Sequence, residues 1–305
     1  MRIVRGLPPV PPEAPPAAVA LGVFDGVHLG HRAILGLAVS HAGAAGMRSI
    51  ACTFDPHPME VLQPGRAPLP ITTLDERLGL IEGCGLDCAV VLPFTRELAA
   101  MEPEAFVKDV LVTRLGARDV VVGFNHRFGR GARGDAAMLR TLGERLGFRT
   151  HVAEPLVVDG VAVSSTEIRA ALQRGELAMA GRLLGRPYTL SGTIAHGAGR
   201  GRTLGFPTAN LVPTRPVLVA AGVYACTAEV AARKERAVVN VGVRPTFGET
   251  ALAVEAYLLD FAGDLYGQTM TLTFVSRIRE ERRFPSIEVL KSQIESDAAE
   301  ARRRL

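Results

Sequence analysis

Short apolar runs alternate with longer helix-like stretches through the first 185 residues. The runs predict five strands, at Val19–Val23, Ser49–Phe54, Ala89–Leu92, Val120–Gly123 and Thr150–Val152. The stretches between them predict helices at His31–Ala45, Leu74–Glu82, Pro103–Leu115 and Asp135–Leu146. Continuously apolar strands that alternate with helices are typical of a doubly wound parallel sheet covered on both faces. The first part of the chain is therefore predicted to be an α/β domain.

The pattern changes after Ser164. The sequence SSTEIRAALQRGEL predicts a helix capped by Ser165 or Thr166, and a second helix, Leu177–Leu184, ends at Gly185. Beyond it, punctuated β-rich runs predict a small antiparallel barrel, with strands at Thr189–Ile194, Val217–Val230, Ala237–Val243, Ala253–Phe261 and Thr269–Ser276. A last helix is predicted from Ser286 to about Arg303. We place the domain boundary near residue 185, which gives domains 1–185 and 186–305.

The stretch Ala20–Leu35, ALGVFDGVHLGHRAIL, carries the first chemical signal. An apolar strand ends at Gly22, a tight turn follows, and His28 and His31 lie across the start of a helix. Unpaired N–H groups converge at such a helix N-terminus and make an anion site, to which two imidazoles add donors. As four letters H-x-G-H is weak, and both histidines could be ordinary polar residues beside a turn. The strand–turn–helix context favours a phosphate site.

Several classes of protein are excluded or disfavoured. GxxxxGK[ST] does not occur, which excludes a P-loop. The turn GVFDG after the first strand is not GxGxxG, so no dinucleotide fingerprint follows that strand. The net charge of +4 comes from scattered arginines with few aromatic residues, so we expect no nucleic-acid partner. No run of 18 apolar residues and no secretory signal is found, so we expect no membrane span and a cytoplasmic location.

Several longer motifs carry a family resemblance. GVFDGVHLGH together with SSTEIR at Ser164–Arg169 resembles the HxGH nucleotidyltransferase superfamily. TFDPHP at Thr53–Pro58 and GFNHRFGRGARGD at Gly123–Asp135 resemble the adenylyltransferase half of bacterial bifunctional riboflavin kinase/FAD synthetases. The second half resembles the kinase of that family through four segments in the same order, HGAGRGRTLGFPTANL (His196–Leu211), VNVGVRPTFG (Val239–Gly248), VEAYLLDFAGDLYGQ (Val254–Gln268) and IREERRF (Ile278–Phe284).

The resemblance implies roles for residues of the first half. His28 and His31 would stabilise the transition state of adenylyl transfer. The β- and γ-phosphates of ATP would be held by Ser165, Thr166 and Arg169, and further ATP contacts are implied for Gly22, Phe24, Asp25, Gly30 and Asn125. One position departs from the family, because His126 stands where an aromatic residue is common. A histidine ring can still stack, and Phe124 and Phe128 flank it.

In the second half, the glycine-rich run brings backbone N–H groups to a phosphate, with ATP contacts expected from Gly197, Gly199, Arg200 and Thr208. Thr208 and Asn210 are two apart and share one face of an extended segment. The resemblance makes them Mg²⁺ ligands, whereas PTAN alone would indicate a turn. Glu255, in an apolar strand, is either on a solvated face or a working base, and the resemblance makes it the general base.

The resemblance also implies that Arg279 and Phe284 help form the flavin side of the kinase pocket, although a solvated loop would explain them as well. The expected enzyme phosphorylates riboflavin with ATP to FMN, and then adenylylates FMN with ATP to FAD and pyrophosphate. Two alternatives remain open from the residues. One is a single-function HxGH transferase whose barrel binds the substrate without catalysing a reaction, and the other is a flavin- or RNA-binding module. The oligomeric state is left open.

Overall fold

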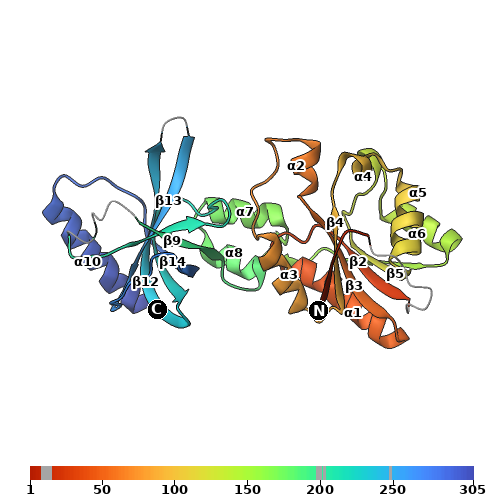
Figure 1. The fold of residues 1–305 in the computed structure, drawn as a ribbon, viewed down its shortest axis with the longest axis horizontal. Helices are drawn as coiled ribbons and strands as arrows, with labels where there is room; N and C mark the ends of the chain where they lie inside the picture. Colours follow the sequence, from red (N-terminus) through yellow and green to blue (C-terminus); the bar gives the residue numbers. More distant parts are fainter. Residues whose placement is uncertain (8–15, 197–200, 202–203, 247–248) are drawn as a thin grey trace. The chain divides into compact units, whose positions relative to one another are not determined.

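The computed structural model describes residues 1–7, 16–196, 201, 204–246 and 249–305. The chain divides into two compact units, Met1–Ser164 and Ser165–Leu305 (Figure 1). This division groups helices α7 (Ser165–Gln173) and α8 (Leu177–Leu184) with the second unit. The boundary expected near residue 185 leaves them with the first, and it remains a prediction.

The first unit is built on a six-stranded parallel sheet with the order β1-β4-β3-β2-β5-β6. Its strands are β1 (Arg2–Arg5), β2 (Ala17–Leu21), β3 (Arg48–Asp55), β4 (Cys88–Pro93), β5 (Ala117–Gly123) and β6 (Arg149–Ala153). The predicted parallel sheet is confirmed, and five of its strands fall on the predicted apolar runs. The short edge strand β1 was not predicted, because RIVR places only two apolar residues between arginines.

Helices cover both faces of this sheet (Figure 1). On one face α1 (Leu29–Ala45) and α3 (Leu74–Glu82) pack on the alanine-rich side of β2, β3 and β4. The other face carries α5 (Pro103–Ala105), the π-helix η1 (Phe106–Arg114) and α6 (Ala136–Leu146). The helix predicted at Pro103–Leu115 is thus wider than an α-helix over most of its length. Smaller elements complete the unit: α2 (Pro58–Leu62), α4 (Arg96–Ala100), η2 (Arg130–Ala132), β7 (Val157–Val158) and β8 (Val161–Ala162).

In the second unit, six antiparallel strands among the described residues close into a barrel in the order β10-β13-β12-β11-β14-β9. They are β9 (Thr189–Ala195), β10 (Ala209–Pro213), β11 (Gly222–Val230), β12 (Arg233–Thr246), β13 (Glu249–Leu258) and β14 (Thr269–Arg279). The last helix, α10 (Ile287–Arg304), is capped by Ser286 and packs Ala298 and Ala301 against the outside of β11. The predicted barrel with its terminal helix is confirmed.

The strand β10 was not predicted, because the sequence PTAN alone indicates a turn. In the structure Ala209–Pro213 pairs with β13 on one side and β9 on the other, so it closes the barrel. Within the part of the chain that the structure describes, no helix is both long and apolar enough to cross a bilayer.

Candidate active sites

The turn between β2 and α1 is buried and strained. Phe24 and Val27 are fully buried and adopt positive φ angles of 56° and 39°. A branched side chain such as that of Val27 rarely adopts this conformation, which persists only where the surroundings over-determine it. Arg77, from α3, contributes by donating hydrogen bonds from its Nη1 to the carbonyl oxygens of Val23 (2.8 Å) and Phe54 (3.1 Å). The turn is therefore held in one shape.

Asp25 is the second side chain that fixes the position of this turn. Its buried carboxylate accepts hydrogen bonds from the backbone N–H of Ile71 (3.0 Å) and Thr72 (3.1 Å) and from the Thr72 hydroxyl (3.1 Å). The same hydroxyl oxygen accepts from Gly26 N–H at 3.1 Å. In this structure Asp25, for which the resemblance implies an ATP contact, ties the turn to the segment before α3.

The two histidines lie side by side at the start of α1. His28 is the N-cap residue, and its Nδ1 accepts a hydrogen bond from the backbone N–H of His31 at 3.2 Å. In a neutral ring that accepts at Nδ1, the proton is on Nε2, which makes Nε2 a donor for an anion. The two imidazoles are stacked with centroids 3.5 Å apart. The Phe24 ring is perpendicular to that of His31, with the two ring centroids 5.4 Å apart.

Two glycines leave room for these rings. A Cβ atom at Gly30 would lie 3.2 Å from Cε1 of His28, and one at Gly22 would lie 2.9 Å from the ring of Phe24. A larger residue at Gly22 would have to displace the Phe24 ring, and one at Gly30 would crowd the His28 ring. The spacing H-x-G-H therefore has a steric reason in addition to a chemical one.

The loop after β5 carries Asn125, which is exposed, and His126, which is half-buried. The ring of His126 stacks on Phe128 with centroids 5.9 Å apart, and Phe128 in turn packs against Phe106. The buried Nε2 of His126 has no hydrogen-bond partner among the described residues. Burial lowers the pKa of His126 to about 4, so the ring is neutral near pH 7. In this structure the ring of His126 packs in one group with Phe128 and Phe106.

Ser165, Thr166 and Arg169 lie in the first two turns of α7. The helix begins at Ser165, so Ser165 and Thr166 lie within its first turn and not before it, as the cap expected at either residue requires. These residues belong to the second compact unit. Their position beside the imidazoles of α1 remains a prediction.

In the barrel, Glu255 lies between two asparagines. In the strand register it pairs with Asn210 of β10 on one side and with Asn240 of β12 on the other. Residues that pair in this way point to the same face of a sheet, with Cβ atoms about 5 Å apart. Val254 and Ala256 are buried in the barrel, so Glu255 and both amides are on its outer face. This row brings together the predicted base and one predicted metal ligand.

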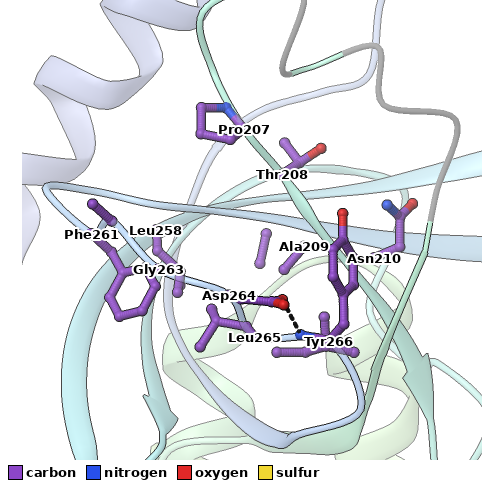
Figure 2. Close-up of a pocket in the computed structure, with 13 residues that line it drawn as sticks. Pro207, Thr208, Ala209, Asn210, Leu258, Phe261, Gly263, Asp264, Leu265 and Tyr266 are labelled. Carbon is purple, nitrogen blue, oxygen red and sulfur yellow. Dashed lines mark hydrogen bonds between the residues drawn. The ribbon is translucent and has the colours of Figure 1, made fainter.

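A cavity of about 670 Å³ lies beside this row (Figure 2). Thr208, Ala209 and Asn210 form one wall, and the loop 261–266 forms the other. In that loop Asp264 accepts a hydrogen bond from the backbone N–H of Tyr266 at 3.0 Å, and the Tyr266 ring stacks on His196 at 3.7 Å. Gly197, Gly199 and Arg200, which were predicted to contact ATP, lie outside the described residues.

Arg279 and Phe284, the predicted flavin contacts, are in contact with each other. The guanidinium of Arg279 lies 5.5 Å from the centroid of the Phe284 ring. Arg279 also donates hydrogen bonds from Nε (3.1 Å) and Nη2 (2.8 Å) to the buried carboxylate of Asp297 in α10. In this structure Arg279 joins the end of β14 to α10 and supports the Phe284 ring.

Two family models match successive parts of the chain. The model described as FAD synthetase matches residues 10–167, and the one described as riboflavin kinase matches residues 184–305. The chain belongs to the bifunctional riboflavin kinase/FMN adenylyltransferase family. The member of this family from Pseudomonas fluorescens is 38% identical over 303 residues, covering 99% of this chain and 97% of the relative. The Bacillus subtilis member is 36% identical over 296 residues, covering 95% and 92%.

A solved structure is similar over the full length. The crystal structure described as a macrolide-efflux protein from Streptococcus pneumoniae aligns with a TM-score of 0.90 at 29% identity, covering 99% of both chains. The two family models and the curated relatives confirm the resemblance of the sequence motifs to bifunctional riboflavin kinase/FAD synthetases at the level of the family.

For this bifunctional family member, sequence reasoning missed residues that the structure places at the sites. Asn240 lies in the quoted segment VNVGVRPTFG but was given no role, because its pairing with Glu255 depends on strand register. Phe261 and Tyr266 lie in the quoted segment VEAYLLDFAGDLYGQ. Their signal was an aromatic pair around Gly263 and Asp264 in a loop, a pattern that also fits an ordinary turn.

Proposed function

We propose that this chain makes FAD from riboflavin in two ATP-dependent steps, one in each compact unit. The barrel unit transfers the γ-phosphoryl group of ATP to the 5′-hydroxyl of riboflavin and yields FMN and ADP. The α/β unit transfers the adenylyl group of a second ATP to the FMN phosphate and yields FAD and pyrophosphate. The observation that carries the proposal is that each unit matches one of two family models and has its own cluster of polar side chains.

In the adenylyl step, a phosphate oxygen of FMN attacks the α-phosphorus of ATP, and the bond from that phosphorus to the bridging oxygen breaks. Negative charge builds on the phosphoryl oxygens and on the leaving pyrophosphate. The Nε2–H of His28, the ring of His31 and the N-terminus of α1 are donors fixed before the substrate arrives. One well-placed donor of this kind is worth about 3–4 kcal/mol in the transition state.

In the kinase step, Glu255 accepts the proton of the riboflavin 5′-hydroxyl as the oxygen attacks the γ-phosphorus. The cavity between β10 and loop 261–266 takes the adenosine of ATP, because it combines aromatic and apolar walls with an opening beside Asn210. The flavin ring binds near Phe284. The guanidinium of Arg279 lies over the Phe284 ring and is itself held by a hydrogen bond to Asp297 of α10.

Mg²⁺ fits the residues at this site. The Thr208 hydroxyl and the Asn210 amide oxygen are hard ligands on one wall of the cavity. A Cβ atom at Gly201 would lie only 2.9 Å from the Thr208 hydroxyl oxygen, so the glycine leaves this oxygen accessible. When bound, Mg²⁺ neutralises charge on the phosphates of ATP. Thr208 and Asn210 orient that end of the nucleotide toward Glu255, which pairs with Asn210 across the strands.

A product assay tests the proposal. Purified protein is incubated with riboflavin, ATP and Mg²⁺, and the flavins are separated by chromatography while ADP and pyrophosphate are measured. We expect FMN to rise first with one ADP per FMN, followed by FAD with one pyrophosphate per FAD. Absence of any new flavin would refute the proposal. FAD formed from supplied FMN, without ADP formation from riboflavin, would instead support the single-function transferase.

The proposal also includes a cytoplasmic location and no nucleic-acid partner. A flavin- or RNA-binding module without catalysis would bind RNA with an affinity that falls steeply as salt is added. We expect no such binding, because the arginines are scattered along the chain.

A further inference from the structure

A second histidine cluster lies in the α/β unit, away from the carboxyl ends of the strands. One ligand atom from each of His41, Asp119 and His151 lies within 4.8 Å of the other two. Asp119 is near the beginning of β5, whereas the loop with His126 follows the end of that strand at Gly123. At about 3.3 Å per residue, the cluster is roughly 13 Å from that end. It is therefore distinct from the His28–His31 pair.

The local structure explains how these residues meet. Asp119 and Val121 point to the same face of β5, and Val121 packs in the core under α1. In the neighbouring strand β6, His151 is paired with Val121, and so its ring lies on this face as well. His41, in the last turns of α1, lies one position before Ala42, which is buried. The ring of His41 stacks on that of His151 with centroids 3.8 Å apart.

The carboxylate of Asp119 is buried and has strong partners. It accepts from Nε2 of His151 at 2.6 Å and from Arg149 at 2.9 Å (Nε) and 2.8 Å (Nη2). The side chain of Asp119 is fully buried, while that of Arg149 is 68% exposed. Arg149 and His151 together satisfy the buried charge, so His41 is not needed for that purpose. Among the described residues, the side chain of His41 has a ring contact with His151 and no hydrogen bond.

We propose that His41, Asp119 and His151 form a binding site for one divalent transition-metal ion, with Zn²⁺ as the best match. Two imidazoles and one carboxylate are ligands that Zn²⁺ accepts in proteins, with water in the fourth position. The same set disfavours Mg²⁺, which prefers oxygen ligands. His41 and His151 are half-buried, so an ion reaches them from solvent.

Binding requires two local movements. The stacked imidazoles turn about their Cβ–Cγ bonds so that one nitrogen of each points to the ion, a torsion with a broad energy profile in histidine. Arg149 withdraws from Asp119 into solvent, because its positive charge occupies the place that the cation takes. Arg149 therefore competes with the metal, and its removal strengthens metal binding.

The test titrates the full chain with ZnCl₂ by calorimetry at pH 7.5 without nucleotide, and with CoCl₂ by visible absorption. We expect one ion per chain and a tetrahedral Co²⁺ spectrum. His41→Ala with His151→Ala should weaken binding by more than about 100-fold. Arg149→Gln should bind more tightly than wild type. The matched control is His28→Ala with His31→Ala, which removes two stacked histidines at the other end of the sheet and should keep both the stoichiometry and the Co²⁺ spectrum.

Two outcomes would overturn the proposal. One is that His41→Ala with His151→Ala binds the ions as wild type does. The other is that the wild type shows no Co²⁺ spectrum and no saturable heat with Zn²⁺, which would leave the cluster as a set of partners for buried Asp119. Thermal unfolding in EDTA shows whether each variant is folded. If the double variant does not fold, Asp119→Asn, which keeps the side-chain shape and removes the charge, takes its place with the same expected loss.

Discussion

The two candidate active sites hold their polar groups in opposite ways. At the start of α1, Asp25 and His28 are buried, Asp25 accepts hydrogen bonds from two backbone N–H groups and the Thr72 hydroxyl, and Val27 is held at a positive φ angle. On the barrel, Glu255 and its two paired asparagines are half-exposed along regular strands. The first site is held by a network of side-chain contacts, while the second takes its geometry from strand register. Substitutions should therefore affect both folding and catalysis at the first site, and catalysis alone at the second.

The largest effect is expected for Glu255→Gln, which keeps the shape of the side chain and removes its ability to accept a proton. FMN formation should fall by about 10²–10⁴-fold, the usual contribution of a general base. The midpoint of thermal unfolding should stay at the wild-type value, because a half-exposed strand position tolerates the change. The rates are measured with riboflavin for the kinase step and with FMN for the adenylyl step.

FAD formation from FMN is the internal control for this variant and should be unchanged. A kinase rate within a few-fold of wild type would contradict the assignment of the base. Loss of both activities in a folded variant would contradict the separation of the two sites.

The next effect separates the two roles of His28. His28→Asn keeps a side-chain oxygen that caps α1, and His28→Ala removes the cap as well. Both should lower FAD formation by about 10²–10³-fold, because both remove the Nε2 donor. Only His28→Ala should also lose about 1 kcal/mol of stability, measured by urea unfolding. An Asn variant that retained full adenylyl activity would show that His28 serves only as a cap.

The local pattern of apolar and polar residues predicted those helices and strands in which buried positions repeat regularly along the chain. Leu74–Glu82 and Leu177–Leu184 were predicted at the bounds that the structure gives them: Thr73 and Gly83 flank the first helix, and Gly185 ends the second. β1 and β10 were missed, because each is defined by pairing with distant strands and not by its own residues. The same reason explains why Asn240 received no role.

At the first site, the sequence indicated which histidines belong to the site. It did not indicate which hydrogen bonds and contacts fix their positions. His28 and His31 could be predicted to share a helix start, because three residues make about one turn. That Asp25 binds the backbone of Ile71 and Thr72 depends on contacts between segments 46 and 47 residues apart in the chain. The cap that His28 forms through Nδ1 is local, three residues from its partner, but the side-chain conformation that makes it is not visible in the letters H-x-G-H. The pairing of His41 with His151 was likewise hidden, because it depends on how α1 packs on β6.

A third, smaller effect concerns pH and the stack beside the first site. His126 has a pKa of about 4 when folded, lowered by burial from the ordinary value of 6.5. Between these values the unfolded chain binds more protons, so stability rises with pH across that window. The shift corresponds to a gain on the order of 3 kcal/mol from pH 4 to pH 7.

His126→Phe should remove this part of the pH dependence while keeping the stack on Phe128. Urea unfolding of wild type and variant at pH 4.5 and pH 7 measures the free energy of unfolding of each protein at both pH values. The variant should be the more stable of the two at pH 4.5 by a larger margin than at pH 7. An equal difference at both pH values would mean that the folded histidine titrates as it does in the unfolded chain.

The smallest effect is expected at the open cavity of the barrel. Tyr266 is 47% exposed, and its ring stacks on His196 and lines the space proposed for adenosine. An aromatic contact of this kind is worth about 1 kcal/mol, so Tyr266→Leu should raise the KM for ATP in the kinase step about fivefold. Tyr266→Phe should behave as wild type, because the ring remains. The adenylyl step, measured with FMN, should be unaffected in both variants. A leucine variant that lowered kcat by orders of magnitude, or that unfolded at lower temperature, would show that the barrel site is as rigid as the site at α1 and would remove the contrast between them.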